Sequence, residues 1–444
     1  MNRSYAFALI SLACLLLSPH GVTGQTRQEK ILKDRDKVLA DGFWIYNDLD
    51  RGIELARDKN LPLLVTLRCL PCEECVKLDE ELIERHAEVQ PLLEKFVRVR
   101  LITTNNLDLN LFQFDTDQSF AVFFLNADGT IYGRFGTRSD QIQWADDVSI
   151  EGLARAMEGA LELHAGYPAN KPSLVAKRGP RPEFAVPQDF PLHKGKFGPR
   201  LDYEGNVVKS CIHCHMIGDA ARQLVRDREG KLPENLLYPF PHPKTVGLTL
   251  DPKSRATVLA VEPNSPAASA GLEPGDRILT LEGQPPLSIA DVQWVLHQAD
   301  SDLALLKFVV RRGEESRTLT MTLNRGWRRL DDIAWRASSW GLRRMGLGGA
   351  YFKTLDEDQR TALRLDANRQ GLYVAHVGLY SPHDQAHKAG LKKGDVLLKF
   401  AGREFQRESD LLRHALNEIR VGDSVTLVVE RQGEPLEIKL QMAR

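Results

Sequence analysis

The sequence predicts a multidomain protein with an α/β domain first, a short cysteine-containing segment next, and two mainly-β (α+β) domains last. Three observations predict this fold class. Residues 30–165 alternate between helix-like and strand-like patterns, cysteines cluster at two-residue spacing, and one string of small residues occurs twice after residue 245. A chain of 444 residues is also too long for one ordinary core.

Charge and composition narrow the classes of function. The chain has 59 basic and 60 acidic residues, and no basic stripe interleaved with aromatic residues. Nucleic acid is therefore not expected as a partner.

The first residues have the pattern of a secretory signal peptide. Arg3 gives a positive start, Phe7 to Leu17 is an apolar run, and small residues precede a cut near Gln25. We expect residues 1–24 to be a signal peptide, and no transmembrane span in the mature chain. The protein is then expected in the periplasm or another extracytoplasmic space, where thiols can oxidise.

The first domain is expected at residues 30–165. Residues 30–60 have a rough helical period, followed by strands at 61–67, 96–102 and 121–125 and a hairpin partner at 130–135. The turn between the last two strands is Asn126-Ala127-Asp128-Gly129. A helix at 150–164 closes this α/β layer structure.

Three cysteines, Cys69, Cys72 and Cys75, follow the first strand of this domain. A thiol at Cys72 would lie at the start of the expected helix, where unpaired N–H groups lower its pKa. Cys75 lies one turn later, where it can form or resolve a disulfide. A copper or zinc site on the three thiolates and a static disulfide are the alternatives.

The order of strand, CxxC, helix and Phe123–Gly129 hairpin resembles the thioredoxin superfamily over about residues 40–165. The resemblance implies that Cys72 attacks and Cys75 resolves, with Cys69 as an added thiol. The family normally has a cis-proline before the third strand, whereas this chain has Ser119-Phe120. The missing proline puts substrate docking in doubt.

A Pro-, Gly- and Lys-rich stretch at residues 166–200 is expected to be an extended linker. The segment 201–244 follows, and its Cys211-Ile-His-Cys214-His215 pattern fits c-type haem attachment. Two thiols at this spacing can bond to the two vinyl groups of a haem, and His215 would be the proximal ligand. His242 is the first candidate for the distal ligand, with His193 and Tyr238 next. A disulfide and a zinc site are the alternatives.

The repeated string runs from Ser265 to Asp276 and from Ser381 to Asp395, and each copy precedes a strand, a helix and a hairpin. It resembles bacterial PDZ domains, with matches at 245–325 and 345–442. The resemblance implies a groove in which an extended peptide adds as a strand and its C-terminal carboxylate meets backbone N–H groups.

In the first copy the carboxylate loop would be Val246-Gly247-Leu248, with Leu250 beside it. In the second copy the loop would be Met345-Gly346-Leu347-Gly348, before an inserted stretch. Protein or peptide C-termini are therefore the expected partners, and unused scaffolding is the alternative.

A Trp- and Arg-rich connector at residues 326–344 separates the copies and is expected to form a packed interdomain surface. The chain contains no Gly-x-Ser-x-Gly motif, and no protease is expected. The arrangement resembles a family of exported bacterial thioredoxin-like/PDZ proteins with a CxxCH segment. We expect thiol–disulfide redox or electron transfer with PDZ recruitment. A non-catalytic adaptor carrying a metal or haem is the alternative.

Overall fold

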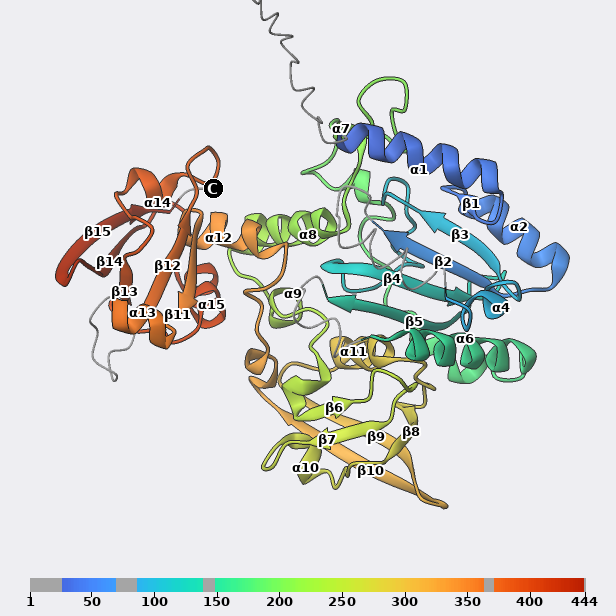
Figure 1. The fold of residues 1–444 in the computed structure, drawn as a ribbon. Coiled ribbons are helices and arrows are strands. Elements are labelled where there is room, and N and C mark those ends of the chain that lie inside the picture. The colour runs from blue at the N-terminus through green and yellow to red at the C-terminus, as the bar shows by residue number, and fades with distance from the viewer. Residues whose placement is uncertain (1–25, 69–85, 139–147, 363–370, 443–444) are drawn as a thin grey trace, which may run out of the picture.

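We analysed a computed structural model, which describes residues 26–68, 86–138, 148–362 and 371–442. Three lobes are visible in Figure 1: the first domain, and two repeat domains, with α8 running from the first domain towards the second repeat domain. We call residues 248–324 the first repeat domain and residues 350–441 the second.

The first domain is built on a mixed five-stranded sheet with the order β1-β3-β2-β4-β5. The strands β1 and β2 run parallel to β3, and β4 runs antiparallel to both β2 and β5. Its elements are α1 Arg27–Asp41, β1 Ile45–Tyr46, α2 Leu49–Lys59, β2 Leu63–Arg68, α4 Gln90–Leu93, β3 Val97–Leu101, β4 Gln118–Leu125, β5 Ile131–Arg138 and α6 Ile150–Ala165.

Two apolar cores lie on the faces of this sheet. One packs against α1 and α6 and the other against α2 and α8, so every residue of β2 is buried. The expected hairpin at Asn126–Gly129 is confirmed, since the Asn126 N–H donates to the Thr130 carbonyl at 2.8 Å. The expectation of helix through 30–60 is wrong at its centre, because α1 ends at Asp41, Gly42 caps it, and Ile45–Tyr46 pair with β3.

The stretch 166–200 is a folded part of the molecule, and the expectation of an extended linker is wrong. It contains the short 3₁₀ helices η2 Lys171–Ser173, η3 Val175–Lys177 and η4 Pro187–Asp189. Leu174 joins a core of the first domain, and Lys177 and His193 are buried. Pro and Gly set tight turns here, but the apolar residues between them pack.

The segment before the repeat domains is helical and joins the lobes. It consists of α7 Val207–Ser210, α8 Cys214–Glu229, α9 Glu234–Leu237 and η5 Pro243–Val246. Ile217 and Ala220 of α8 pack into the first domain, while Leu232 and Leu237 belong to the core of the second repeat domain.

The first repeat domain combines two small sheets with the orders β6-β7 and β10-β9-β8. Its elements are β6 Leu248–Leu250, β7 Val258–Val261, α10 Pro266–Ser269, β8 Arg277–Leu281, α11 Ile289–Gln298, β9 Leu303–Arg312 and β10 Glu315–Asn324. The connector follows with η6 Trp327–Leu330 and α12 Ser339–Leu347.

The second repeat domain has one sheet with the order β11-β12-β13-β14-β15. Its elements are β11 Ala350–Thr354, α13 Glu357–Ala362, β12 Leu372–Val377, α14 Gln385–Lys388, β13 Val396–Phe400, α15 Glu408–Glu418, β14 Ser424–Arg431 and β15 Glu434–Gln441. The expected carboxylate loop at 345–348 is largely helical instead, because Met345 to Leu347 end α12 and Gly348 caps it with a φ of 62°.

Candidate functional site

The carboxyl ends of two parallel strands form one edge of the first domain's sheet. β2 ends at Arg68 and β3 ends at Leu101, and the two strands are hydrogen-bonded neighbours. Arg68 is buried and forms an ion pair with Asp34 of α1. In the sequence Cys69 follows Arg68 directly. Cys69, Cys72 and Cys75 lie outside the described residues, so their predicted roles stay predictions.

The CxxCH segment is attached to this same edge by hydrogen bonds. Thr104 uses both its N–H and its Oγ1 to donate to the Ile212 carbonyl, at 3.1 and 2.8 Å. Asn105 completes the attachment: its Oδ1 accepts from the Ile212 N–H at 2.8 Å, and its Nδ2 donates to the Ser210 carbonyl at 3.0 Å. Four bonds from two adjacent residues therefore hold the backbone of the motif in one position.

The structure brings Cys211 and Cys214 to the ends of β2 and β3. Cys211 is 4% exposed, and its Sγ lies 3.4 Å from the Thr103 Oγ1. Burial raises the pKa of the Cys211 thiol, and the bond to Thr103 partly opposes that shift. Cys214 is the first residue of α8, where helix N–H groups stabilise negative charge, and it lines a narrow gap with Leu67 and Arg68.

The two histidines of the motif lie in parallel. The rings of His213 and His215 have centroids 5.8 Å apart and an interplanar angle of 2°. Burial, the neighbouring His215 and Arg27 lower the pKa of His213 to about 4. Burial also lowers the pKa of His215, while Asp117 acts in the opposite direction. Both imidazoles are therefore neutral at pH 7 and able to donate or accept a hydrogen bond.

A covalent haem needs a flat slot beside both thiols and the following histidine. Ligand pockets of that kind enclose about 300–1,000 Å³. Within the part of the chain that the structure describes, the gap between Cys214 and the ends of β2 and β3 has no room for even a water molecule, and Cys211 is bonded to Thr103. This packing does not fit a haem against the first domain, and haem attachment stays a sequence prediction.

The candidate distal ligand His242 lies elsewhere. It precedes η5, where its Nδ1 accepts from the Lys244 N–H at 3.2 Å, and η5 leads directly into β6. His242 therefore lies at the entry to the first repeat domain, and its role as distal ligand stays a prediction. His193 is also buried, and its Nδ1 donates to the Pro187 carbonyl at 2.8 Å.

The expected peptide-binding residues of the first repeat domain lie at the start of β6. Val246, Leu248 and Leu250 are buried in that domain's core, and Gly247 has a φ of 77°. A Cβ at Gly247 would lie 2.1 Å from the Cβ of Ser265, so only glycine fits this turn. β6 pairs with β7 along one edge, and α11 is the helix expected to face the other.

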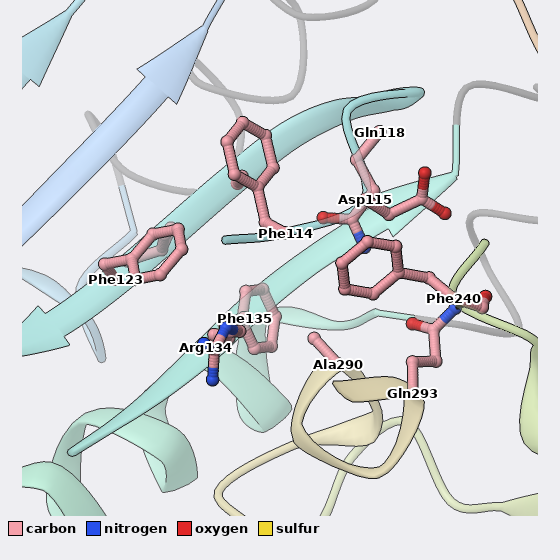
Figure 2. Close-up of a pocket in the computed structure, with 11 residues that line it drawn as sticks. Phe114, Asp115, Gln118, Phe123, Arg134, Phe135, Phe240, Ala290 and Gln293 are labelled. Carbon is pink, nitrogen blue, oxygen red and sulfur yellow. Dashed lines mark hydrogen bonds between the residues drawn. The ribbon is translucent and has the colours of Figure 1, made fainter. Parts of the chain in front are cut away.

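The helix α11 is also docked on the first domain. Figure 2 shows Ala290 of this helix beside Phe135 of β5 and Gln293 beside Phe240, around a cavity of only about 10 Å³ that Arg134 also lines. Asp291 accepts from the Lys177 ammonium at 2.9 Å, and Leu287 is part of the first domain's core. The groove helix and the sheet of the first domain are thus packed together.

A buried ionic network that the sequence analysis missed joins the connector to the edge before β4. The Arg336 guanidinium donates to Asp115 at 2.6 Å and to Asp117 at 3.3 Å. The N–H and Oγ of Ser338 donate to Asp117 at 2.8 and 2.7 Å. Asp115 and Asp117 lie just before β4, close in the sequence to Ser119-Phe120, which stands where related folds have their cis-proline. The only feature of the sequence that could have indicated this network is the high density of Arg in the connector, where Arg328 and Arg336 are buried.

In the part of the chain that the structure describes, no set of three His, Cys, Asp or Glu side chains is arranged to hold a metal ion. None of its helices is both long and apolar enough to cross a bilayer.

The domain assignments are supported by comparison with known families. Residues 44–127 match the thioredoxin-like family model, and residues 257–310 and 357–442 each match a PDZ domain model. The chain therefore contains a thioredoxin-like domain and two PDZ domains, which we call PDZ1 and PDZ2.

The curated relatives share parts of the chain. A DegP-like periplasmic serine endoprotease of Marinomonas sp. (strain MWYL1) is 28% identical over 193 residues, which is 44% of this chain and 38% of the relative. The serine protease Do-like HtrA of Lactobacillus helveticus is 31% identical over 103 residues, 23% of each chain. This chain thus spans less than half the length of either relative.

Among solved structures, the HtrA-type protease AlgW with a decapeptide is 15% identical, with a TM-score of 0.22. The match covers 32% of this chain and 50% of that one. This likeness carries no argument about function.

Proposed function

We propose that this chain is an extracytoplasmic thiol–disulfide redox protein that recruits its partner through a PDZ groove. The observation that carries the proposal is the attachment of the CxxCH segment beside Arg68, the residue before Cys69. The second dithiol motif is thereby held at the end of β2, from which the chain continues in sequence to Cys69, Cys72 and Cys75. A second dithiol at that edge suits exchange between the pairs better than a purely structural role does.

In the proposed reaction the Cys72 thiolate attacks a partner disulfide, forming a mixed disulfide and releasing one partner thiolate, which takes up a proton. Cys75 then attacks Cys72, which releases the second partner thiol and leaves a Cys72–Cys75 disulfide. The Cys211/Cys214 dithiol can reduce that disulfide in the same two steps, losing two electrons and two protons. Cys214 is the better first attacker of this pair, because Cys211 is buried and its pKa is raised.

A haem or a metal would give the chain a different chemistry. A haem at Cys211 and Cys214 would supply one-electron exchange, and copper or zinc would need the thiolates of Cys69, Cys72 and Cys75. The dithiol proposal uses none of these groups. A pyridine haemochrome spectrum of protein made with a haem-attachment system, together with elemental analysis, tests them directly.

The deciding experiment is a redox titration of the purified chain with thiol trapping and intact mass analysis. We expect Cys72 and Cys75 to cycle between dithiol and disulfide near the potential of the compartment. Cys75→Ser should trap the mixed disulfide between Cys72 and the partner, Cys72→Ser should abolish cycling, and Cys69→Ser should leave cycling intact as the matched control. Cysteines that stay inert, or filled by metal, would contradict the redox proposal.

A non-catalytic adaptor is the second candidate. The observation that favours it is the extent of buried ion pairs between domains, such as Arg336 with Asp117 and Lys177 with Asp291. These pairs fix the lobes to one another, as a scaffold requires. Inert cysteines together with retained peptide binding would support this candidate instead.

A further inference from the structure

The two PDZ domains differ at the strand edge to which a peptide would add. Strand addition requires backbone N–H and C=O groups that are free along the edge between the second-strand equivalent and the helix. In PDZ2 these elements are β11 and α15, and β11 pairs with β12 on its other edge. The state of the N–H groups on the α15 side therefore decides whether PDZ2 can bind a peptide in this way.

In PDZ2 that edge is already bonded to a side chain of the same domain. The Phe352 N–H donates to the Glu408 Oε1 at 2.8 Å, and Glu408 is the first residue of α15. Two residues further along β11, the Thr354 Oγ1 donates to the Gln406 carbonyl at 3.1 Å. A carboxylate thus occupies the position where the carbonyl of an added strand would accept from Phe352.

A buried arginine holds this carboxylate in place. The Nη2 of Arg343, from α12, donates to the Glu408 Oε2 at 2.6 Å, and its Nε lies 3.1 Å from Oε1. The side chains of both residues are 2% exposed. Removing only one partner would leave a buried charge unpaired, which is strongly unfavourable. An incoming peptide would have to meet that cost to displace Glu408, which is why the contact closes the groove.

Among the residues that the structure describes, PDZ1 has no counterpart of this contact. The strand registers align Leu248 with Ala350 and Leu250 with Phe352, because Leu248 pairs with Val261 as Ala350 pairs with Val377. The Asp251 N–H donates to the carbonyl of Thr257, the residue before β7, at 2.8 Å. Because successive N–H groups of a strand point to opposite edges, the N–H of Leu250 points to the α11 side. The first residue of α11 is Ile289, whose side chain cannot accept a hydrogen bond.

We infer that PDZ2 is closed to strand addition by its own Glu408–Arg343 pair, which leaves the backbone edge of β6 in PDZ1 to take an extended peptide. The Gly247 N–H, which donates to the Lys244 carbonyl at 3.0 Å, would have to be released to meet the carboxyl terminus of that peptide. This inference deepens the proposed recruitment step. It does not depend on the cysteines, because the peptide is bound by backbone groups of a different domain. PDZ2 serves instead to anchor α8 and α9, through bonds such as the Leu232 N–H to the Asn417 Oδ1 at 2.8 Å.

The test removes the closing contact from PDZ2 in one variant and introduces a closing carboxylate in PDZ1 in another. Arg343→Met with Glu408→Leu removes both charges and keeps apolar volume, which avoids an unpaired ion. Ile289→Glu puts a carboxylate at the first residue of α11, the PDZ1 position that corresponds to Glu408 at the start of α15. The probe is a pool of unstructured decapeptides with the last four positions randomised and a free carboxylate, together with the same pool amidated.

We expect the full mature chain to bind a peptide selected from the pool at one site per chain, and to bind the amidated form at least about tenfold more weakly. The PDZ1 variant should lose this binding, and the PDZ2 variant should keep it. Hydrogen exchange at the Phe352 amide should be slow in the wild type and fast in the PDZ2 variant, which reports opening without any peptide. Circular dichroism establishes that each variant is folded.

Three results would overturn the inference: selection of no peptide at all, binding that survives in a folded PDZ1 variant, or binding that disappears in the PDZ2 variant. Fast exchange at the wild-type Phe352 amide would overturn the closing contact itself. The redox titration has a different readout, so inert cysteines with intact one-site binding would refute only the redox proposal.

Discussion

The carboxyl group of Asp219, on α8, provides a sharp test of the packing between α8 and the connector. Its Oδ1 is buried without a hydrogen-bond partner in the described chain, and a Cβ at Gly341 of α12 would lie 2.8 Å from it. Burial, with a smaller contribution from Asp117, raises the pKa of Asp219 from 3.8 to about 7, against the opposing effect of Arg222. The ionised carboxylate is therefore held where its charge is poorly solvated.

The substitution Asp219→Asn removes that charge while preserving the size of the side chain. A difference of about three pKa units corresponds to at most about 4 kcal/mol at about 1.36 kcal/mol per unit, and we expect about 2–4 kcal/mol. Because the folded-state pKa is raised, the folded state retains this proton to higher pH than the unfolded state does. Wild-type stability therefore falls as the pH rises from about 4 to about 7 and is level above that range.

The gain in folding stability from Asp219→Asn should accordingly be near zero below pH 4 and should reach its full size by pH 8. The measurement is hydrogen exchange of α8 and α12 amides, with the variant and the wild type compared at pH 5 and at pH 8. Asp227→Asn, an exposed position on the same helix, is the matched control and should show no such dependence. A gain of equal size at both pH values, or a loss at pH 8, would refute the argument.

Three other substitutions test the contacts between domains. Leu287→Ala should weaken the docking of PDZ1 on the thioredoxin-like domain by about 2–5 kcal/mol, measured as faster proteolysis between the two, whereas equal resistance would argue against this contact. Arg336→Met should destabilise the chain by about 3–5 kcal/mol in denaturant unfolding, because Asp115 and Asp117 are left buried without their partner; a neutral effect would show that the network is not needed. Asn105→Ala should accelerate alkylation of Cys211, because the bonds to Ile212 and Ser210 are lost; an unchanged rate would mean that the attachment does not control access.

Local patterns in the sequence were sufficient to predict the fold and position of the individual domains. The turn at Asn126–Gly129 and the strands beside it follow from short-range turn chemistry and burial, and they appear where they were expected. The paired strings ending in Asp276 and Asp395 correctly located both PDZ domains. Each of these aspartates caps its turn and binds an arginine of the following hairpin, Arg312 or Arg431.

What could not be predicted depends on contacts between distant parts of the chain. Composition rich in Pro and Gly suggested a linker at 166–200, but Lys177 is buried there by its ion pair with Asp291 of PDZ1. Arg336 and Asp117 belong to different domains in the sequence, so no local pattern pairs them. The attachment of Ile212 to Thr104 and Asn105 likewise joins segments that the sequence gives no reason to place together.

These long-range contacts bear on how recruitment could help redox chemistry. With a flexible tether, a PDZ domain would raise only the effective concentration of a partner near the thiols. PDZ1 is docked on β5 through Leu287 and through Asp291, which accepts from the Arg134 N–H at 3.2 Å. β5 pairs with β4, and β4 pairs with β2, which ends at Arg68. A peptide on β6 would therefore be presented in a fixed direction relative to that edge. Docking of this kind favours partners whose disulfide lies at one particular distance from their carboxyl terminus, which a flexible tether would not select.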